Sequence, residues 1–129
     1  MGGKHNTRLY EKLRLPSYWF ISKFISGKSA LSETDTFTVI TDEASSKTKL
    51  VIGYSAVNTN RVTIPVTSSE FSNIDNISFN ANLFKEVLIA NKDCESATLE
   101  VSSAGLSRIK FSIDNYDSEY FLVSTQAVN

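Results

Sequence analysis

The residue types that most often carry catalysis are sparse in this chain. The one histidine, His5, lies among the first residues, and the one cysteine, Cys94, stands between Asp93 and Glu95. Neighbouring carboxylates disfavour a reactive thiolate at Cys94. The sequence contains no glycine-rich phosphate loop and no cluster of histidine and cysteine with metal-ligand spacing. We therefore expect a protein that is not an enzyme and that uses no cofactor and no metal.

Two groups of acidic residues and one group of aromatic residues offer alternative chemistry. Asp114, Asp117 and Glu119 fall in a predicted hairpin, as Asp42 and Glu43 fall in another, and solvated turns explain both groups better than metal sites. The aromatic group follows Pro16. Its members are Trp19, Phe20 and Phe24. They would suit either a stacking platform for single-stranded nucleic acid or a hydrophobic core. A core is favoured because they share a predicted helix with other apolar residues.

Charge is divided unevenly along the sequence. Residues 1–28 carry six basic groups and one acidic group, a net charge of +5, whereas residues 29–129 carry a net charge of −6. This split predicts a basic patch on an acidic body, which is common in proteins that touch a polyanion with one face. A solvated basic tail over residues 1–8 explains part of it equally well.

Length and composition indicate one soluble domain. The chain has 129 residues, of which 41% are hydrophobic and 21% charged, so it can bury a core of ordinary size. Apolar runs stay far below the roughly 20 residues that cross a bilayer, and the N-terminus lacks a signal-like apolar segment. A single cysteine fits a reducing compartment. We expect a cytoplasmic protein without a membrane partner, with a flexible basic segment at 1–12 and one domain at 13–129.

Hydrophobic patterning predicts a strand, a helix and three strands in the first half of the chain. The strand covers 13–15 and stops at Pro16, and the helix covers 17–27, where Gly27 would end it. Strands follow at 36–41, 49–54 and 61–66. Pro65 lies inside the last of these, which predicts an edge or a bulge.

The second half repeats this order. A short strand covers 77–79, and Asn80 is a suitable N-cap for a helix over 81–91. Strands follow at 97–102, 107–113 and 119–124, joined by turns at Ala104-Gly105 and Asp114-Asn115.

An internal repeat explains this order. An offset of 64 residues aligns the first strand and helix of each half. The aligned pairs are Leu13 with Ile77, Leu15 with Phe79, Trp19 with Leu83, Phe20 with Phe84, Phe24 with Leu88, Ile25 with Ile89 and Lys28 with Lys92. We therefore predict an α+β fold of two pseudo-repeated β-α-β-β-β units, with two helices packed on antiparallel sheets. Strand edges left open at both sides would pair with another copy, and a head-to-tail contact with suitable rotation closes a ring.

The segment Ile77 to Val123, ISFNANLFKEVLIANKDCESATLEVSSAGLSRIKFSIDNYDSEYFLV, resembles the last domain of bacterial or tailed-phage DNA sliding clamps. The similarity consists of a short strand with a Phe-Asn pair, a helix with the pattern L-x-x-x-L, and three strands of alternating apolar and polar residues up to the C-terminus. The first half fits this family in the order and length of its elements. Together the resemblance covers about residues 13–124. It rests on element order and hydrophobic pattern, because sliding clamps have no catalytic signature.

This resemblance implies a polymerase processivity factor. Six such domains would form a ring around duplex DNA, with helices lining the hole and binding phosphates without reading sequence. The implied partners are DNA, a clamp loader, and polymerases that dock apolar peptides on the outer surface. Tyr116, Tyr120 and Phe121 are candidates for the edge of such a docking groove, although core or hairpin packing explains them better. The implied DNA-binding residues are Arg14, Lys23, Lys28, Lys85 and Lys92.

The helices fit this expectation unequally. On the second helix, Leu83, Phe84, Val87 and Leu88 form the expected buried arc, and Lys85 and Lys92 lie opposite. The first helix offers one lysine on its polar arc, Lys23, supplemented by Arg14 and Lys28 at its ends. Sliding clamps usually carry two or three such domains in one chain, so we expect either a homo-oligomeric ring or association with further clamp domains.

Two alternatives stay open. One is a protein–protein interaction module, such as a phage protein that mimics a clamp domain and modulates replication without binding DNA. The other is a small enzyme such as a nuclease, which would need clustered carboxylates that the sequence does not offer.

Overall fold

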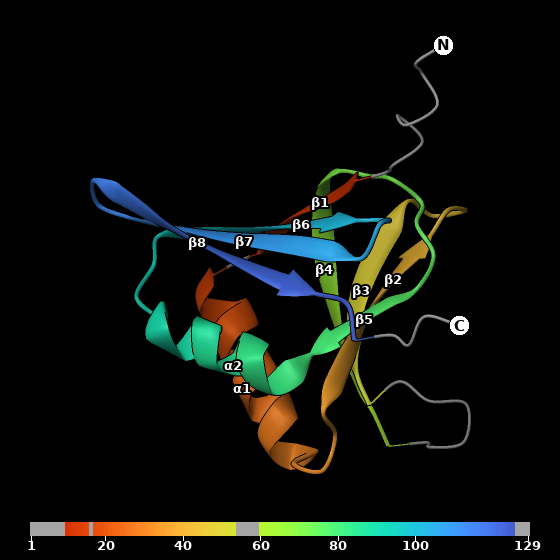
Figure 1. The fold of residues 1–129 in the computed structure, drawn as a ribbon, viewed down its shortest axis with the longest axis horizontal. Helices are drawn as coiled ribbons and strands as arrows, with labels where there is room; N and C mark the ends of the chain where they lie inside the picture. The colour runs from red at the N-terminus through yellow and green to blue at the C-terminus, as the bar shows by residue number, and fades with distance from the viewer. Residues whose placement is uncertain (1–9, 16, 54–59, 126–129) are drawn as a thin grey trace.

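Eight strands and two helices make up the part of the chain that the computed structural model describes, residues 10–15, 17–53 and 60–125 (Figure 1). The strands are β1 (Tyr10–Leu15), β2 (Thr36–Asp42), β3 (Lys47–Ile52), β4 (Val62–Glu70), β5 (Ile77–Asn80), β6 (Ser96–Ser102), β7 (Leu106–Ile113) and β8 (Tyr116–Val123). The helices are α1 (Ser17–Ala30) and α2 (Ala81–Ala90). The predicted elements are therefore all present. β1 begins at Tyr10 rather than at Leu13, so residues 10–12 belong to the sheet and their assignment to a flexible segment at 1–12 is wrong.

The strands form one antiparallel sheet in the order β5-β2-β3-β4-β1-β6-β7-β8. β1 joins the two halves of the chain, because it pairs with β4 on one side and with β6 on the other. The ends of the sheet are β5 and β8. They approach one another, since the amide of Thr125, just beyond β8, donates to the carbonyl of Ser78 in β5 at 2.9 Å. The expected mixture of α and β structure with antiparallel strands is confirmed.

Both helices lie together on one side of the sheet, where they cover the core (Figure 1). Phenylalanine rings from the helices and from two strands fill the space between the layers. Phe84 of α2 packs against Phe24 of α1 with ring centroids 4.8 Å apart and against Phe37 of β2 at 4.7 Å. Burial of these rings supplies much of the hydrophobic stabilisation that fixes the helices to the sheet.

Helix α1 continues one turn beyond its predicted end. Gly27 was expected to stop the helix, but α1 runs on to Ala30. The glycine instead allows close packing, because a Cβ atom at this position would lie 2.9 Å from Cγ1 of Val62 in β4. The prediction failed because a glycine that ends a helix and a glycine that lets a strand approach look the same in sequence.

Helix α2 follows its prediction more closely. The side chain of Asn80 accepts a hydrogen bond from the backbone N–H of Leu83 at 2.9 Å, which caps the first turn as expected. Phe84 and Leu88 are buried, Val87 is partly buried, and Leu83 is 52% exposed, so its predicted place in the core is wrong.

Pro65 lies in the half of β4 that has only one neighbouring strand. Residues 62–66 pair with β3, and β1 pairs with β4 only from Thr67 onward. In an antiparallel sheet, the backbone groups of successive residues point to alternate neighbouring strands. The hydrogen bond from the amide of Ala81 to the carbonyl of Asp35 fixes this alternation for β2, and the registers carry it through β3 to β4. The backbone groups of Thr63 and Pro65 therefore point away from β3. The missing N–H of Pro65 therefore leaves the β3–β4 ladder intact, and the predicted edge position is confirmed among the described strands.

Candidate functional site

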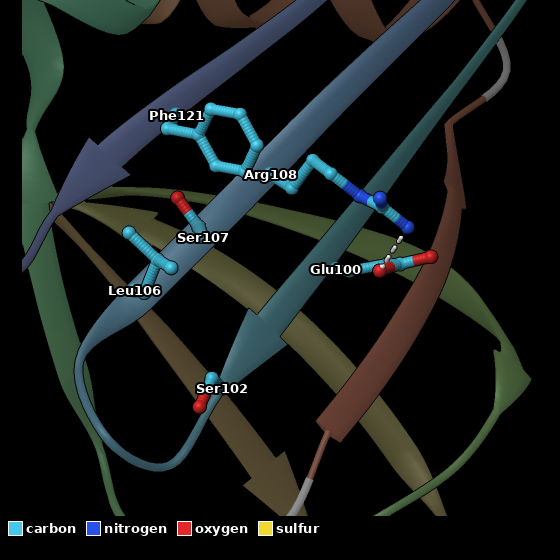
Figure 2. Close-up of a pocket in the computed structure, with 6 residues that line it drawn as sticks. All are labelled: Glu100, Ser102, Leu106, Ser107, Arg108 and Phe121. Carbon is cyan, nitrogen blue, oxygen red and sulfur yellow. Dashed lines mark hydrogen bonds and ion pairs between the residues drawn. The ribbon is translucent and has the colours of Figure 1, made fainter.

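A hollow on the outer face of the sheet, the face turned away from the helices, is bordered by two exposed apolar side chains of β7 and β8, Leu106 and Phe121 (Figure 2). We call it the arginine hollow. Glu100, Ser102, Leu106, Ser107, Arg108 and Phe121 line it. The hollow encloses about 230 Å³.

Strand register brings the apolar members of this site together. Leu106 lies opposite Val123, and Arg108 lies opposite Phe121. Because alternate residues of a strand share a face, Phe121 and Val123 project from β8 on the same side. Phe121 is 58% exposed and Val123 is 73% exposed, so with Leu106 they form an apolar strip beside the hollow. The strip is suited to contact with an apolar partner.

Arg108 is held between carboxylates from both neighbouring strands. Its Nη2 atom lies 2.8 Å from Oε1 of Glu100 in β6, and its Nη1 atom lies 3.1 Å from Oε2 of Glu119 in β8. These partners raise the pKa of Arg108 above its ordinary value, chiefly through the hydrogen bond that it donates to Glu100. The guanidinium charge of Arg108 is therefore compensated by two carboxylates.

The remaining aromatic candidates have different environments. Tyr120 is partly buried, its hydroxyl accepts a hydrogen bond from Nδ2 of Asn91 at 3.1 Å, and its ring packs against Phe111. Tyr116 is exposed at the hairpin between β7 and β8. Of the three aromatic residues predicted to border a docking groove, Phe121 alone lines the arginine hollow.

The structure separates the five predicted DNA-binding residues. Lys23 on α1 and Lys92 after α2 are exposed, and Lys85 on α2 is partly buried. These three belong to the helical layer. Two neighbouring acids, Glu86 and Asp93, are exposed beside them.

Arg14 and Lys28 do not belong to the exposed helical face. Leu13 and Leu15 point into the core, so the exposed Arg14 between them projects from the opposite face of the sheet. Lys28 is only 4% exposed, and its Nζ atom donates to the carbonyl of Ser32 at 3.2 Å. The expected outward position of Lys28 is therefore wrong, because the side chain is almost fully buried and a backbone carbonyl accepts a hydrogen bond from its ammonium group.

The exposed helical face also carries apolar side chains. Trp19 on α1 is 46% exposed, and Leu83 and Ile89 on α2 are exposed to a similar extent. The predicted burial of Phe20 and Phe24 is confirmed, but Trp19 lies outside the core.

Other classes of site find no support in the described part of the chain. The residues 10–15, 17–53 and 60–125 include no group of three or more histidine, cysteine, aspartate or glutamate side chains that could hold a metal ion. No helix within these ranges has the length and apolar character needed to cross a membrane. Cys94 is buried as a free thiol, and His5 lies outside the described residues.

Sequence reasoning missed the arginine hollow apart from Phe121. Its residues come from three strands, and their proximity depends on the registers of β6, β7 and β8. The available signal was the alternation of β8, in which Phe121 and Val123 flank the buried Leu122. Comparisons with protein-family models, with curated proteins and with solved structures found no match.

Proposed function

We propose that this chain is a domain of the sliding-clamp type, a non-catalytic processivity factor that encloses duplex DNA together with other copies or further clamp domains. The observation that carries the proposal is the arrangement of the fold. Two helices lie side by side on one face of an antiparallel sheet whose strands enter it in two β-α-β-β-β series. Such a layer presents helices to one side and strands to the other, as a ring with a helical lining requires.

Burial along the two series supports an internal repeat. At the offset of 64 residues, Phe20 and Phe84 are both buried, and Trp19 and Leu83 are both exposed. The strands correspond as well. The first strand of each series pairs with the strand that follows the helix of the other series: β1 pairs with β6, which follows α2, and β5 pairs with β2, which follows α1. Two aligned pairs depart from this agreement: Lys28 is buried where Lys92 is exposed, and Ile25 is partly buried where Ile89 is exposed.

Two open strand edges support assembly. β8 pairs only with β7 among the described strands, and residues 62–66 of β4 pair only with β3. An unpaired edge offers N–H and C=O groups to another chain. Edges on two different strands permit a head-to-tail contact, although the ladder at the β4 edge would be interrupted at Pro65, which has no N–H to donate. Such a contact closes into a ring when the rotation between copies is suitable.

The apolar strip formed by Leu106, Phe121 and Val123 suits the docking of polymerase or clamp-loader peptides that the resemblance to clamps implies. It lies on the outer face of the sheet, away from the helices that would face DNA. A partner bound there would leave the proposed DNA-facing surface free.

The helical face favours a second candidate, an interaction module that resembles a clamp domain without binding DNA. Lys23, Lys85 and Lys92 are offset there by Glu86 and Asp93, and Trp19 and Leu83 are exposed among them. A face of this composition attracts phosphates less than a uniformly basic one.

Light scattering over a range of concentrations, with and without duplex DNA, tests the assembly. A clamp gives a ring-sized mass, or joins a larger ring when further clamp domains are supplied. A chain that stays monomeric under all these conditions would contradict the proposal.

Charge reversal tests the DNA-facing surface. We expect Lys23→Glu, Lys85→Glu and Lys92→Glu together to weaken duplex binding for all sequences and to reduce its salt dependence by about one unit of slope per lysine. The matched control reverses three lysines of the sheet, Lys47, Lys49 and Lys110, which are exposed on the opposite face. Equal weakening by both triple variants, or by neither, would argue for the interaction module.

A further inference from the structure

The outer face of the sheet repeats the geometry of the arginine hollow with different chemistry. In β6, β7 and β8, Glu100 lies opposite Arg108, which lies opposite Phe121. In β2, β3 and β4, Ile40 lies opposite Lys49, which lies opposite Pro65. The two cross-strand triplets share one backbone pattern. The carboxylate that neutralises the cation in the first triplet is replaced by an aliphatic side chain in the second.

Two adjoining hollows make this second region a groove, which we call the lysine groove. The first hollow encloses about 490 Å³, and Ile40, Asp42, Lys47, Lys49 and Pro65 are among the residues that line it. The second encloses about 360 Å³ and shares Lys47 and Pro65 with the first. It continues past Val66 to Ser68. The groove therefore lies over the paired strands β3 and β4.

The lysines of this groove are available to a ligand. Lys47 and Lys49 are exposed, and neither has an ion-pair partner in the described part of the chain. Asp42 lies opposite Lys47 in the ladder, but its carboxylate accepts hydrogen bonds from the N–H of Ala44 and from the hydroxyl of Ser45 in the turn. Arg108 in the first triplet, in contrast, is bridged by two carboxylates.

Pro65 determines how a ligand can lie in the groove. It removes an outward N–H from the free edge of β4, so a bound segment cannot complete a regular ladder at this point. Its ring and the side chain of Ile40 instead offer apolar contacts on either side of Lys49. An extended segment lying across the face of the strands satisfies these constraints.

We propose that the lysine groove binds an acidic, extended peptide whose carboxylates pair with Lys47 and Lys49 and whose apolar side chains contact Ile40 and Pro65. The inference rests on two exposed lysines against one lining carboxylate, Asp42, and on the apolar contacts that Ile40 and Pro65 offer beside them. The groove is separate from the helical face and from the arginine hollow, so it gives the domain a second docking site with a different partner specificity. The inference does not depend on DNA binding or on ring formation.

Fluorescence anisotropy of the full chain with a labelled peptide of alternating glutamate and leucine residues tests this inference. We expect Lys47→Glu with Lys49→Glu to weaken binding by about tenfold, because two exposed ion pairs are lost and two repulsive charges are introduced. The same peptide with glutamine in place of glutamate should bind the wild-type chain about as weakly as the glutamate peptide binds the double variant. Circular dichroism of each variant verifies that the sheet is retained.

Two control variants locate the bound peptide. Lys110→Glu reverses an exposed lysine on β7 outside the groove, and Phe121→Ser alters the arginine hollow. Both should leave the affinity within about twofold of wild type, because neither residue contacts the groove. If Lys110→Glu weakens binding as much as the double variant of Lys47 and Lys49 does, the peptide is attracted to the protein surface nonspecifically. If Phe121→Ser weakens binding more than the double variant does, the peptide binds in the arginine hollow. Either result, or no measurable binding to the wild-type chain, overturns the proposal.

Discussion

The three-stranded segments β2-β3-β4 and β6-β7-β8 have the same order and the same antiparallel register, but they present different surfaces. On β6-β7-β8, Arg108 is neutralised by Glu100 and Glu119, and apolar side chains extend beyond it. On β2-β3-β4, Lys47 and Lys49 project without carboxylate partners in the described chain. Backbone pairing thus fixes where a side chain points, and residue choice at a few outward positions decides what it binds.

The core-facing sides of these two three-stranded segments differ as well. Phe37 of β2 lies in a cluster of rings from α1, α2 and β5, whereas Phe111 of β7 has Tyr120 as its one ring partner among the described residues. Both side chains are fully buried. The β2 side of the core therefore depends more on aromatic packing than the β7 side.

The largest expected effect comes from truncating these two rings. Phe37→Ala and Phe111→Ala should each lower the free energy of unfolding by about 3–5 kcal/mol, through lost burial and the cavity left behind. Phe37→Ala should cost more, because it removes contacts with three other rings. Urea denaturation of both variants measures the difference. A larger loss in Phe111→Ala would reverse our assignment of the aromatic side of the core.

A smaller effect is expected from Arg108→Leu. The change leaves Glu100 and Glu119 near one another without the cation, and it should lower the free energy of unfolding by about 1 kcal/mol or less, since the network is partly exposed to water. The raised pKa of Arg108 means that its stabilisation is fully present below the ordinary arginine pKa and is lost only as pH rises through the higher folded value.

The difference in stability between wild type and Arg108→Leu should therefore stay constant between about pH 7 and about pH 10. Denaturation at several pH values measures it. A difference that disappears within this range would show that another titrating group controls the network.

The smallest change in stability is expected from Ile40→Glu, which places a carboxylate opposite Lys49 as Glu100 lies opposite Arg108. Lost contacts of the partly buried isoleucine and a new exposed ion pair should nearly cancel, within about 1 kcal/mol. If Lys49 acts as a free cation, this variant should also lose most of its affinity for an acidic peptide. Ile40→Gln, which adds a polar side chain without charge, is the matched control and should retain more affinity.

The sequence was sufficient where local chemistry decides the structure. Asn80 caps α2 as predicted, and the alternation of apolar residues located the eight strands within a few residues. It was insufficient where a distant contact decides. Gly27 continues α1 because β4 approaches it at Val62, and that approach is not visible in the local pattern.

The candidate sites were harder to predict than the fold. Helical periodicity assigned Leu83 to the core and Lys28 to the surface, and the structure reverses both. A helix that contacts both a sheet and another helix buries a wider or shifted arc than a simple two-layer pattern suggests. The lysine groove and the arginine hollow depend on strand registers, which no short sequence window specifies.

The pairing of β1 with β6 has a consequence for how the chain acquires its structure during synthesis. The ladder pairs Tyr10 through Leu15 with residues 97–102 of β6. Most of the polypeptide must therefore be synthesised before β1 can pair with this second neighbouring strand. Pairings between distant segments carry a high loop-closure cost and slow folding. A nascent chain that ends before β6 cannot complete the centre of the sheet. The two halves should therefore fold together in one late step rather than one after the other as they leave the ribosome.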